Sequence, residues 1–147
     1  MDDISTRCNA IEESYEFMLA YAGQGLSGDE TNPSSARVRG YLQRAAQALS
    51  GLIEACATAL KQDSVGHSET YQSFLDVLDR DARSSRAAIQ IVLAQPRLSS
   101  QLIDNLNASI HLRALLTDLF LIDEIMKLRH IPPKSAVLGV ISGDENQ

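Results

Sequence analysis

The sequence has few of the residues that interrupt helices, and no long stretch of it alternates in the manner of a strand. Its 147 residues include only four prolines and eight glycines, and there is no tryptophan. β-Branched residues are sparse and do not alternate with polar ones, which argues against a sheet with one solvated face. Because Pro and Gly carry the largest penalties inside a helix, their scarcity favours an all-helical chain.

Cysteine is scarce too, since Cys8 and Cys56 are the only two in the chain. Two cysteines make no disulfide framework. Each falls on the apolar side of a different predicted helix, so we interpret each as a small core residue; a disulfide or a reactive thiol is the alternative. A single domain of this length buries about 70% of its unfolded surface, so it needs no disulfide or metal to fold.

Motifs that bind metals and cofactors are missing as well. The chain has no Cys-x-x-Cys, no His-x-x-x-His and no Glu-x-x-His, so we expect no structural zinc, c-type haem or di-iron centre. It also lacks the sequence of a phosphate-binding P-loop. The glycines of residues 23–28 follow a predicted helix rather than a strand, so we interpret them as a helix C-cap and a loop. We therefore expect no cofactor.

The charge of the chain is acidic, with a formal net charge of −6 and a pI of about 4.9. Such a chain repels phosphate backbones. Arg37, Arg39 and Arg44 come nearest to a basic patch, but Tyr41 is the only aromatic residue among them, so we expect no nucleic-acid binding. These arginines could instead pair with the glutamates of the first predicted helix.

The N-terminal residues show neither the basic nor the apolar segment of a signal peptide. No uninterrupted apolar run approaches the roughly 20 residues that cross a bilayer. We therefore expect a cytoplasmic protein that does not insert into membranes.

Hydrophobic residues recur at steps of three and four over four segments, which predicts four helices. Gly23 marks the end of the first helix, and Ser68 marks the start of the third. Pro96 marks the end of that third helix. Short turns join antiparallel neighbours, so the sequence predicts an all-α, antiparallel up-down-up-down four-helix bundle over residues 1–131, followed by a short C-terminal tail, residues 132–147. The predicted helices cover about residues 3–22, 35–62, 68–94 and 100–130.

Two of the predicted helix faces allow two interpretations each. Small residues line one side of the second helix at Ala48, Gly51, Ala55 and Ala59. This stripe either lets another helix approach closely or simply reflects a surface rich in alanine. The outer face of the third helix pairs acids with arginines at i, i+4 spacing, which is typical of a solvated face; an arginine-lined docking patch is the alternative. Its charged residues are Asp76, Asp79, Arg80, Arg83 and Arg86.

The last predicted helix is apolar on two opposite sides. One side, with Leu112, Leu116 and Leu119, can fill the bundle core. The other needs a different cover, because large exposed apolar patches mark interaction sites. The aliphatic segment at residues 136–141, a second subunit or another protein could cover it, and a two-fold homodimer is the commonest solution. The interface candidates are Ile110, Leu121, Ile125, Leu128, Val137, Leu138 and Ile141.

Asp104, His111 and Asp118 recur every seven residues on the same predicted helix and form a polar stripe between its apolar sides. Successive members lie about 10 Å apart along the helix, too far for a direct hydrogen bond. We interpret the stripe as the solvent edge of the helix. The alternative is a polar strip inside an interface, which would set the register between subunits and make His111 pH-responsive.

These patterns predict a small non-enzymatic accessory, adaptor or regulatory protein that acts through protein–protein interaction, as a homodimer with a further protein partner. One alternative is a bundle that binds a small apolar ligand between helices lined by Leu and Met. Another is an enzyme whose site assembles from Tyr, His and Asp across helices, for example His111 with Tyr71 or Tyr15. The sequence leaves enzymatic activity open but favours its absence, and we assign no catalytic and no metal-binding residue.

Overall fold

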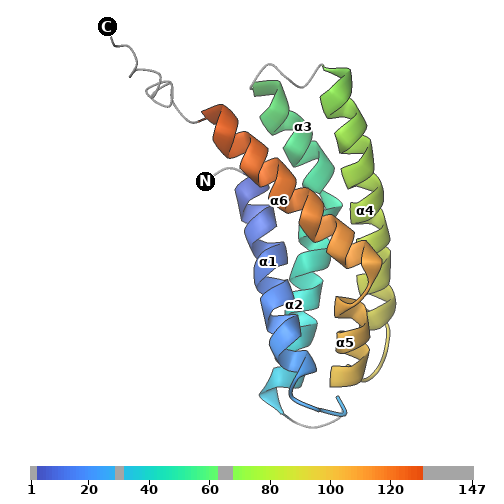
Figure 1. The fold of residues 1–147 in the computed structure, drawn as a ribbon. Helices are drawn as coiled ribbons and strands as arrows, with labels where there is room; N and C mark the ends of the chain where they lie inside the picture. The colour runs from blue at the N-terminus through green and yellow to red at the C-terminus, as the bar shows by residue number, and fades with distance from the viewer. Residues whose placement is uncertain (1–2, 29–31, 63–67, 131–147) are drawn as a thin grey trace, which may run out of the picture. The chain divides into compact units, whose positions relative to one another are not determined.

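The protein is all-helical in the part of the chain that the computed structural model describes, residues 3–28, 32–62 and 68–130 (Figure 1). This part contains six helices and no strand, which confirms the predicted class but not the predicted count of four. The count is wrong because two of the expected helices are each divided in two. The helices are α1 (Asp3–Ala22), α2 (Pro33–Ser50), α3 (Leu52–Gln62), α4 (Glu69–Leu93), α5 (Ser100–Asn107) and α6 (Ile110–His130).

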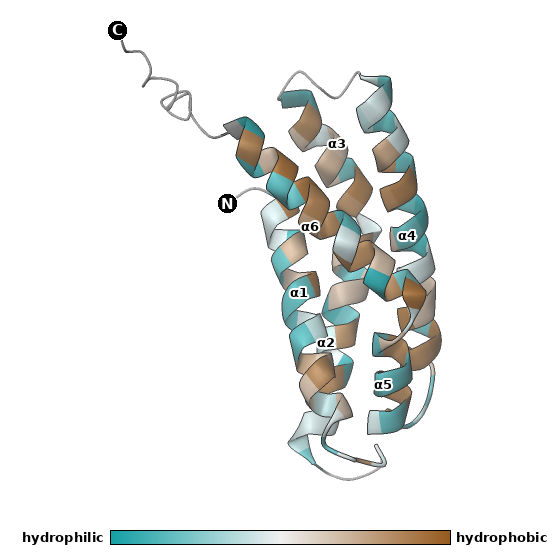
Figure 2. Cartoon of the chain, in the orientation of Figure 1, coloured by the Kyte–Doolittle hydropathy of each residue, from teal (hydrophilic) through white to brown (hydrophobic). Residues whose placement is uncertain are grey.

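The chain divides into two units, residues 1–116 and residues 117–147. In the first unit, α1 packs against α2, α3 and α5, and α4 packs against the same three helices (Figure 1). Hydrophobic and hydrophilic residues alternate along these helices in Figure 2, as expected for helices with one buried side. The most deeply buried large side chains of this unit are Met18, Tyr21, Leu42, Leu52, Leu60, Leu78, Ile89, Leu98, Ile103 and Leu115.

Helix α1 (Asp3–Ala22) begins and ends where the sequence predicted. Its buried side includes Ile4, Ile11 and Met18, which recur every seven residues and so fall on one side of the helix. Tyr21, near the end of α1, is fully buried too. Its polar hydroxyl group therefore lies inside the first unit, where it needs hydrogen-bond partners.

Tyr21 finds those partners in two other segments of the chain. Its hydroxyl donates to the Leu98 carbonyl oxygen at 2.6 Å and lies 3.1 Å from the Ser35 hydroxyl. The Ser100 hydroxyl donates to the Tyr21 carbonyl oxygen at 2.7 Å and accepts from the Leu26 amide at 2.9 Å. The Ser100 amide in turn donates to the Leu26 carbonyl oxygen at 2.8 Å. These bonds fasten the segment after α1 to the segment that leads into α5.

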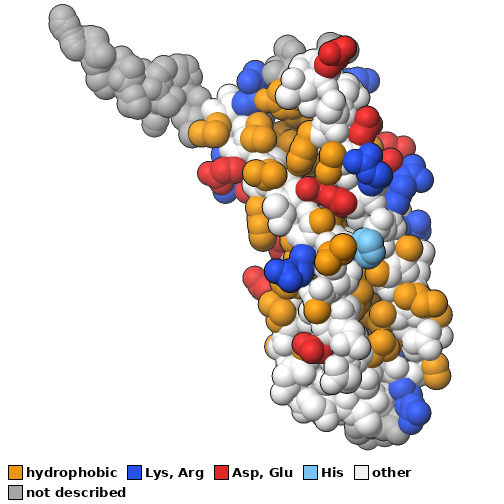
Figure 3. All heavy atoms as spheres, turned by 45° about the vertical axis from the view of Figure 1, so that its right-hand side comes forward, with side chains coloured by type: hydrophobic (Ala, Val, Ile, Leu, Met, Phe, Trp, Pro, Cys, Tyr) orange, Lys and Arg blue, Asp and Glu red, His pale blue; other side chains and the backbone are white. Residues whose placement is uncertain are grey.

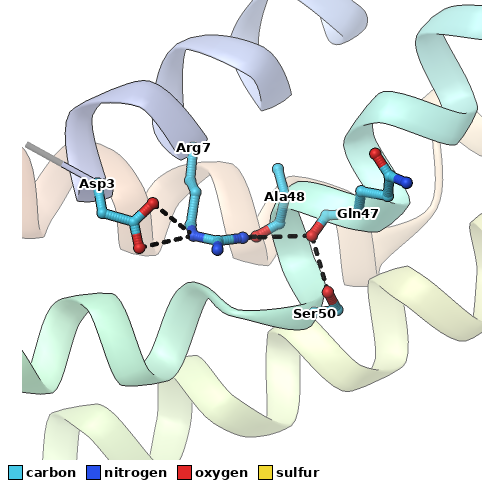
Figure 4. Close-up of polar contacts among 5 residues, drawn as sticks. All are labelled: Asp3, Arg7, Gln47, Ala48 and Ser50. Atoms are coloured by element: carbon cyan, nitrogen blue, oxygen red, sulfur yellow. Dashed lines mark hydrogen bonds and ion pairs between the residues drawn. The ribbon is translucent and has the colours of Figure 1, made fainter.

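The first unexpected helix break lies at Gly51, between α2 and α3. Glycine is a poor helix former, and a Cβ atom at this position would lie 2.7 Å from the Arg7 guanidinium carbon. Arg7 donates to the carbonyl oxygens of Gln47 at 3.3 Å and Ala48 at 3.1 Å, and its Nε lies 3.1 Å from the Asp3 carboxylate (Figure 4). The predicted helix over residues 35–62 is therefore two helices, because an arginine from α1 caps the first of them.

The second break separates α5 from α6, where the sequence predicted one helix over residues 100–130. The Ser109 hydroxyl accepts a hydrogen bond from the His111 amide at 3.2 Å, as an N-cap residue does. Asn107, at the end of α5, donates from Nδ2 to the Met18 carbonyl oxygen at 3.1 Å. The Asn107 side chain thus binds the backbone of α1 at the end of α5, and the Ser109 side chain caps the start of α6.

The predicted stripe of small residues is packed in part. Ala48 and Ala55 are buried, whereas Gly51 and Ala59 are half-buried. The neighbour of the stripe is α1, which contacts both α2 and α3 and lays Arg7 over Gly51. The close-packing interpretation therefore holds only in part, because Gly51, Ala55 and Ala59 also line a groove of about 290 Å³ beside α1.

Candidate functional site

The predicted interface residues on α6 include three large aliphatic side chains that are open to solvent. Ile110, in the first unit, is 74% exposed. Leu121 and Leu128, in the second unit, are 49% and 65% exposed. The three positions are eleven and seven residues apart, so they fall on one side of α6. Ile125 is half-buried, and the remaining candidates, Val137, Leu138 and Ile141, lie outside the described residues.

Hydrophobic side chains also reach the surface elsewhere. On the face drawn in Figure 3 they lie among acidic and basic groups. Ile91, on α4, is 64% exposed, and Phe120 on α6 is 59% exposed. Single exposed apolar side chains are ordinary on protein surfaces. The side of α6 with Ile110, Leu121 and Leu128 differs because three of them share one helix side.

The predicted polar stripe does not run along one helix. Asp104 lies on α5 and His111 on α6, with the helix break between them, and Asp118 lies on α6 within the second unit. Asp104 and His111 are both exposed, but Asp118 is buried at 7% exposure, so the interpretation of the stripe as a solvent edge is wrong at Asp118. The stripe was predicted from seven-residue spacing, which gives a common side only while the helix is continuous.

The backbone of His111 is hydrogen-bonded to α4. Its carbonyl oxygen accepts a hydrogen bond from the Ser85 hydroxyl on α4 at 2.9 Å. Tyr71 lies fourteen residues before Ser85 on the same helix, which corresponds to about 21 Å along its axis. The pairing of His111 with Tyr71, which an enzymatic site would have used, is therefore not formed.

The two cysteines lie on α1 and α3, helices that are in contact. Burial, with a smaller contribution from Cys8, raises the pKa of Cys56 from its ordinary value of 9.0 to about 12. Cys56 therefore stays a thiol at neutral pH. Because the thiolate is the nucleophile and the metal ligand, this cysteine suits a core role and not a reactive one.

The three arginines near the start of α2 have separate tasks. Arg39 caps the C-terminal end of α4, donating to the carbonyl oxygens of Leu93 at 2.9 Å and Gln95 at 3.0 Å. Cationic donors at a helix C-terminus satisfy unpaired carbonyls and favour the helix dipole.

Arg37 and Arg44 lie over aromatic rings. The Arg37 guanidinium carbon is 4.8 Å from the Phe17 ring centroid, and that of Arg44 is 4.3 Å from the Tyr41 ring centroid. The two rings stack on each other with centroids 4.6 Å apart. We call Arg37, Phe17, Tyr41 and Arg44 the arginine–aromatic stack. The sequence did not reveal it, because it depends on how α1 and α2 align.

Grooves between helices of the first unit carry charged groups. One, of about 320 Å³ between the α2–α3 junction and α4, is lined in part by Glu54, Asp79, Arg83 and Arg86. Another, of about 290 Å³ beside α1, is lined in part by Asp3, Arg7 and Glu54. Both differ from the Leu- and Met-lined cavity that binding of an apolar ligand would need.

Among the residues that the structure describes, no group of three or more His, Cys, Asp or Glu side chains is arranged to hold a metal ion. Within the same residues, no helix is both long and apolar enough to span a bilayer. Comparisons with models of protein families, with curated proteins and with solved structures gave no match.

Proposed function

We propose that the chain is a non-enzymatic accessory, adaptor or regulatory protein, and that it forms a homodimer through the exposed apolar side of α6. The observation that supports this is the exposure of Ile110, Leu121 and Leu128, at 74%, 49% and 65%. Fully burying one such side chain contributes about 1.5–3 kcal/mol. A two-fold interface uses each of them twice, so the same surface serves both copies.

The spacing on this side of α6 suits a helix–helix contact. Ile110, Ala114, Thr117, Leu121 and Leu128 follow one another in steps of four, three, four and seven residues. Steps of three and four keep a seam facing a partner helix along several turns. Two copies of α6 can therefore pack seam to seam. The cytoplasmic location expected from the sequence is part of this proposal, and microscopy of a tagged chain checks it.

Light scattering coupled to gel filtration tests the dimer. At micromolar concentration we expect twice the 16.0 kDa mass of the chain. Leu121→Lys should return the mass of a single chain with unchanged helical circular dichroism, because it places a charge in the seam without removing a helix-forming residue. Ile91→Lys is the matched control, since Ile91 is 64% exposed on α4 and should leave the dimer intact.

Two results would reject the homodimer. One is a single-chain mass for the unchanged protein throughout the micromolar range. The other is equal dissociation by Leu121→Lys and Ile91→Lys, which would show that the side of α6 has no special role.

A further inference from the structure

A groove of about 470 Å³ lies between α2 and α4 in the first unit. We call it the α2–α4 groove. Nine described residues line it, and none is an aspartate or a glutamate. Arg44 on α2 and Arg86 on α4 supply positive charge from the two helices, and three glutamine amides, Gln43, Gln47 and Gln90, lie in the same lining. In a chain of net charge −6, the lining of this groove carries only positive charge, although its Ser50 and Arg86 also line the adjoining groove that holds Glu54 and Asp79.

The two arginines are both exposed, and one of them is held in position. Arg44 rests on the Tyr41 ring at 4.3 Å, as part of the arginine–aromatic stack. Such a contact restricts the side chain but leaves the planar donor edge of the guanidinium available. Arg86 donates no hydrogen bond within the described part of the chain. Guanidinium groups bind carboxylates through two parallel hydrogen bonds, so these are suitable donors for an acidic ligand.

Gly40 gives the groove a second unusual feature. It lies inside α2, where glycine is a much poorer helix former than alanine. Among the described residues no neighbour explains the glycine, because a Cβ atom added there would meet none of their heavy atoms within 4 Å. A bare backbone in the lining of a groove allows another chain to approach closely. Gly40 therefore points to an occupant independently of the arginines.

We propose that the α2–α4 groove binds an acidic segment of another protein, with carboxylates on Arg44 and Arg86 and the segment passing close to Gly40. The span from Gly40 to Ser50, which also lines the groove, is ten residues of helix, or about 15 Å. At about 3.3 Å per extended residue, four or five residues of a partner fill it. The lining offers no aromatic side chain for base stacking, which favours a protein over a nucleic acid. The site is separate from the proposed α6 dimer seam.

Fluorescence anisotropy with the full chain and a fluorescein-labelled hexaglutamate peptide tests the groove. We expect the unchanged protein to bind it, and Arg44→Ala and Arg86→Ala each to weaken binding at least about fivefold. Arg80→Ala removes the same charge from an exposed position on α4 that does not line the groove, so it should change affinity less than about twofold. A hexaglutamine peptide should not bind.

Gly40→Ala separates binding from folding. Alanine fits the open space at this position and is the better helix former, so the midpoint of thermal unfolding should stay or rise. The same variant should weaken peptide binding at least about fivefold, since it narrows the closest approach to the backbone.

Three results would overturn the proposal. The first is no binding of hexaglutamate by the unchanged protein up to about 1 mM, which corresponds to less than about 4 kcal/mol of binding free energy. The second is equal weakening by Arg80→Ala and Arg86→Ala, which would indicate diffuse charge attraction. The third is tighter binding of a single-stranded oligonucleotide of equal charge than of the peptide.

Discussion

Gly28 tolerates no side chain without a change in the backbone around it. Its φ angle is +92°, in the region that side chains rarely adopt, and a Cβ atom would lie 2.6–2.8 Å from backbone atoms of Leu98. That backbone cannot move away easily, because the Leu98 carbonyl oxygen holds the buried Tyr21 hydroxyl. Sequence alone showed Gly28 only as one of several loop glycines. Its constraint comes from a segment seventy residues further along the chain.

Gly28→Ala should therefore lower the free energy of unfolding by about 3 kcal/mol or more, from backbone strain and the clash together. Gly25→Ala is the matched control. Gly25 has a φ angle of +68°, but no heavy atom of the described residues lies within 4 Å of an added Cβ, so it should lose only the strain, about 1–2 kcal/mol. Urea denaturation of both variants measures the difference, and equal losses would contradict the close approach to Leu98.

Cys56 makes stability depend on pH in the alkaline range. Its pKa in the folded chain, about 12, lies above its ordinary 9.0, so the folded protein retains this proton to higher pH than the unfolded chain. The resulting stabilisation is fully present below about pH 9 and is lost toward pH 12, at up to about 1.4 kcal/mol per pH unit.

Cys56→Ala removes this titration but keeps every other group that titrates in the same range. The free energy of unfolding of the unchanged protein should therefore fall more steeply between about pH 9 and pH 11 than that of the variant. Parallel curves for the two proteins would show that the pKa of Cys56 is not raised.

At the scale of the helices, the break at Gly51 depends on Arg7. Arg7→Met removes the donors that cap the carbonyl oxygens of Gln47 and Ala48, and should cost about 1 kcal/mol. Gly51→Ala should cost a similar amount, since its Cβ would lie 2.7 Å from the Arg7 guanidinium and displace that flexible group.

A double-mutant cycle distinguishes this mechanism from simple helix propensity. In the Arg7→Met background the capping bonds are already gone, so Gly51→Ala should add no further cost and can gain stability as a better helix former. Additive losses in the double variant would indicate that Gly51 and Arg7 act independently.

The helix ends show what could be predicted from sequence and what could not. Ser68 was predicted as the N-cap of α4, and its hydroxyl does accept from the Thr70 amide, at 3.1 Å. The break before α6 also had a local signal, because Ser109 is a good N-cap residue. The break at Gly51 had one local signal, the glycine itself, but the arginine that caps α2 comes from a different helix and had none. A helix end can be predicted from sequence when the residue that caps it lies next to it in the chain.

The two candidate sites also differ in how far the sequence predicts them. Periodicity placed Ile110, Leu121 and Leu128 on one side of a helix, and all three are exposed. The α2–α4 groove could not be predicted, because Arg44 and Arg86 meet there only once two helices pack side by side. The arginines of α4 allowed two interpretations, a solvated face and a docking patch. Arg83 does form the i, i+4 ion pair with Asp79 at 3.0 Å, as a solvated face predicts, and the docking patch stays a proposal.

At the scale of the whole molecule, a homodimer would couple folding to concentration. If two copies associate through α6, the midpoint of thermal unfolding rises with protein concentration, because association stabilises the folded chain by mass action. Leu121→Lys should remove this dependence, and Ile91→Lys should keep it. Scanning calorimetry at two concentrations tenfold apart measures the effect, and a midpoint that does not move would count against the dimer.

The arginine–aromatic stack has an optical consequence. The chain contains no tryptophan, so its near-ultraviolet signals come mainly from four tyrosines. Tyr41 lies between the Phe17 ring and the Arg44 guanidinium, at 4.6 and 4.3 Å, where a ring held rigidly in an asymmetric setting gives a strong dichroic band. If the acidic ligand proposed above draws Arg44 away from this ring, the near-ultraviolet dichroism of Tyr41 should change. Binding in the α2–α4 groove could then be followed without a dye.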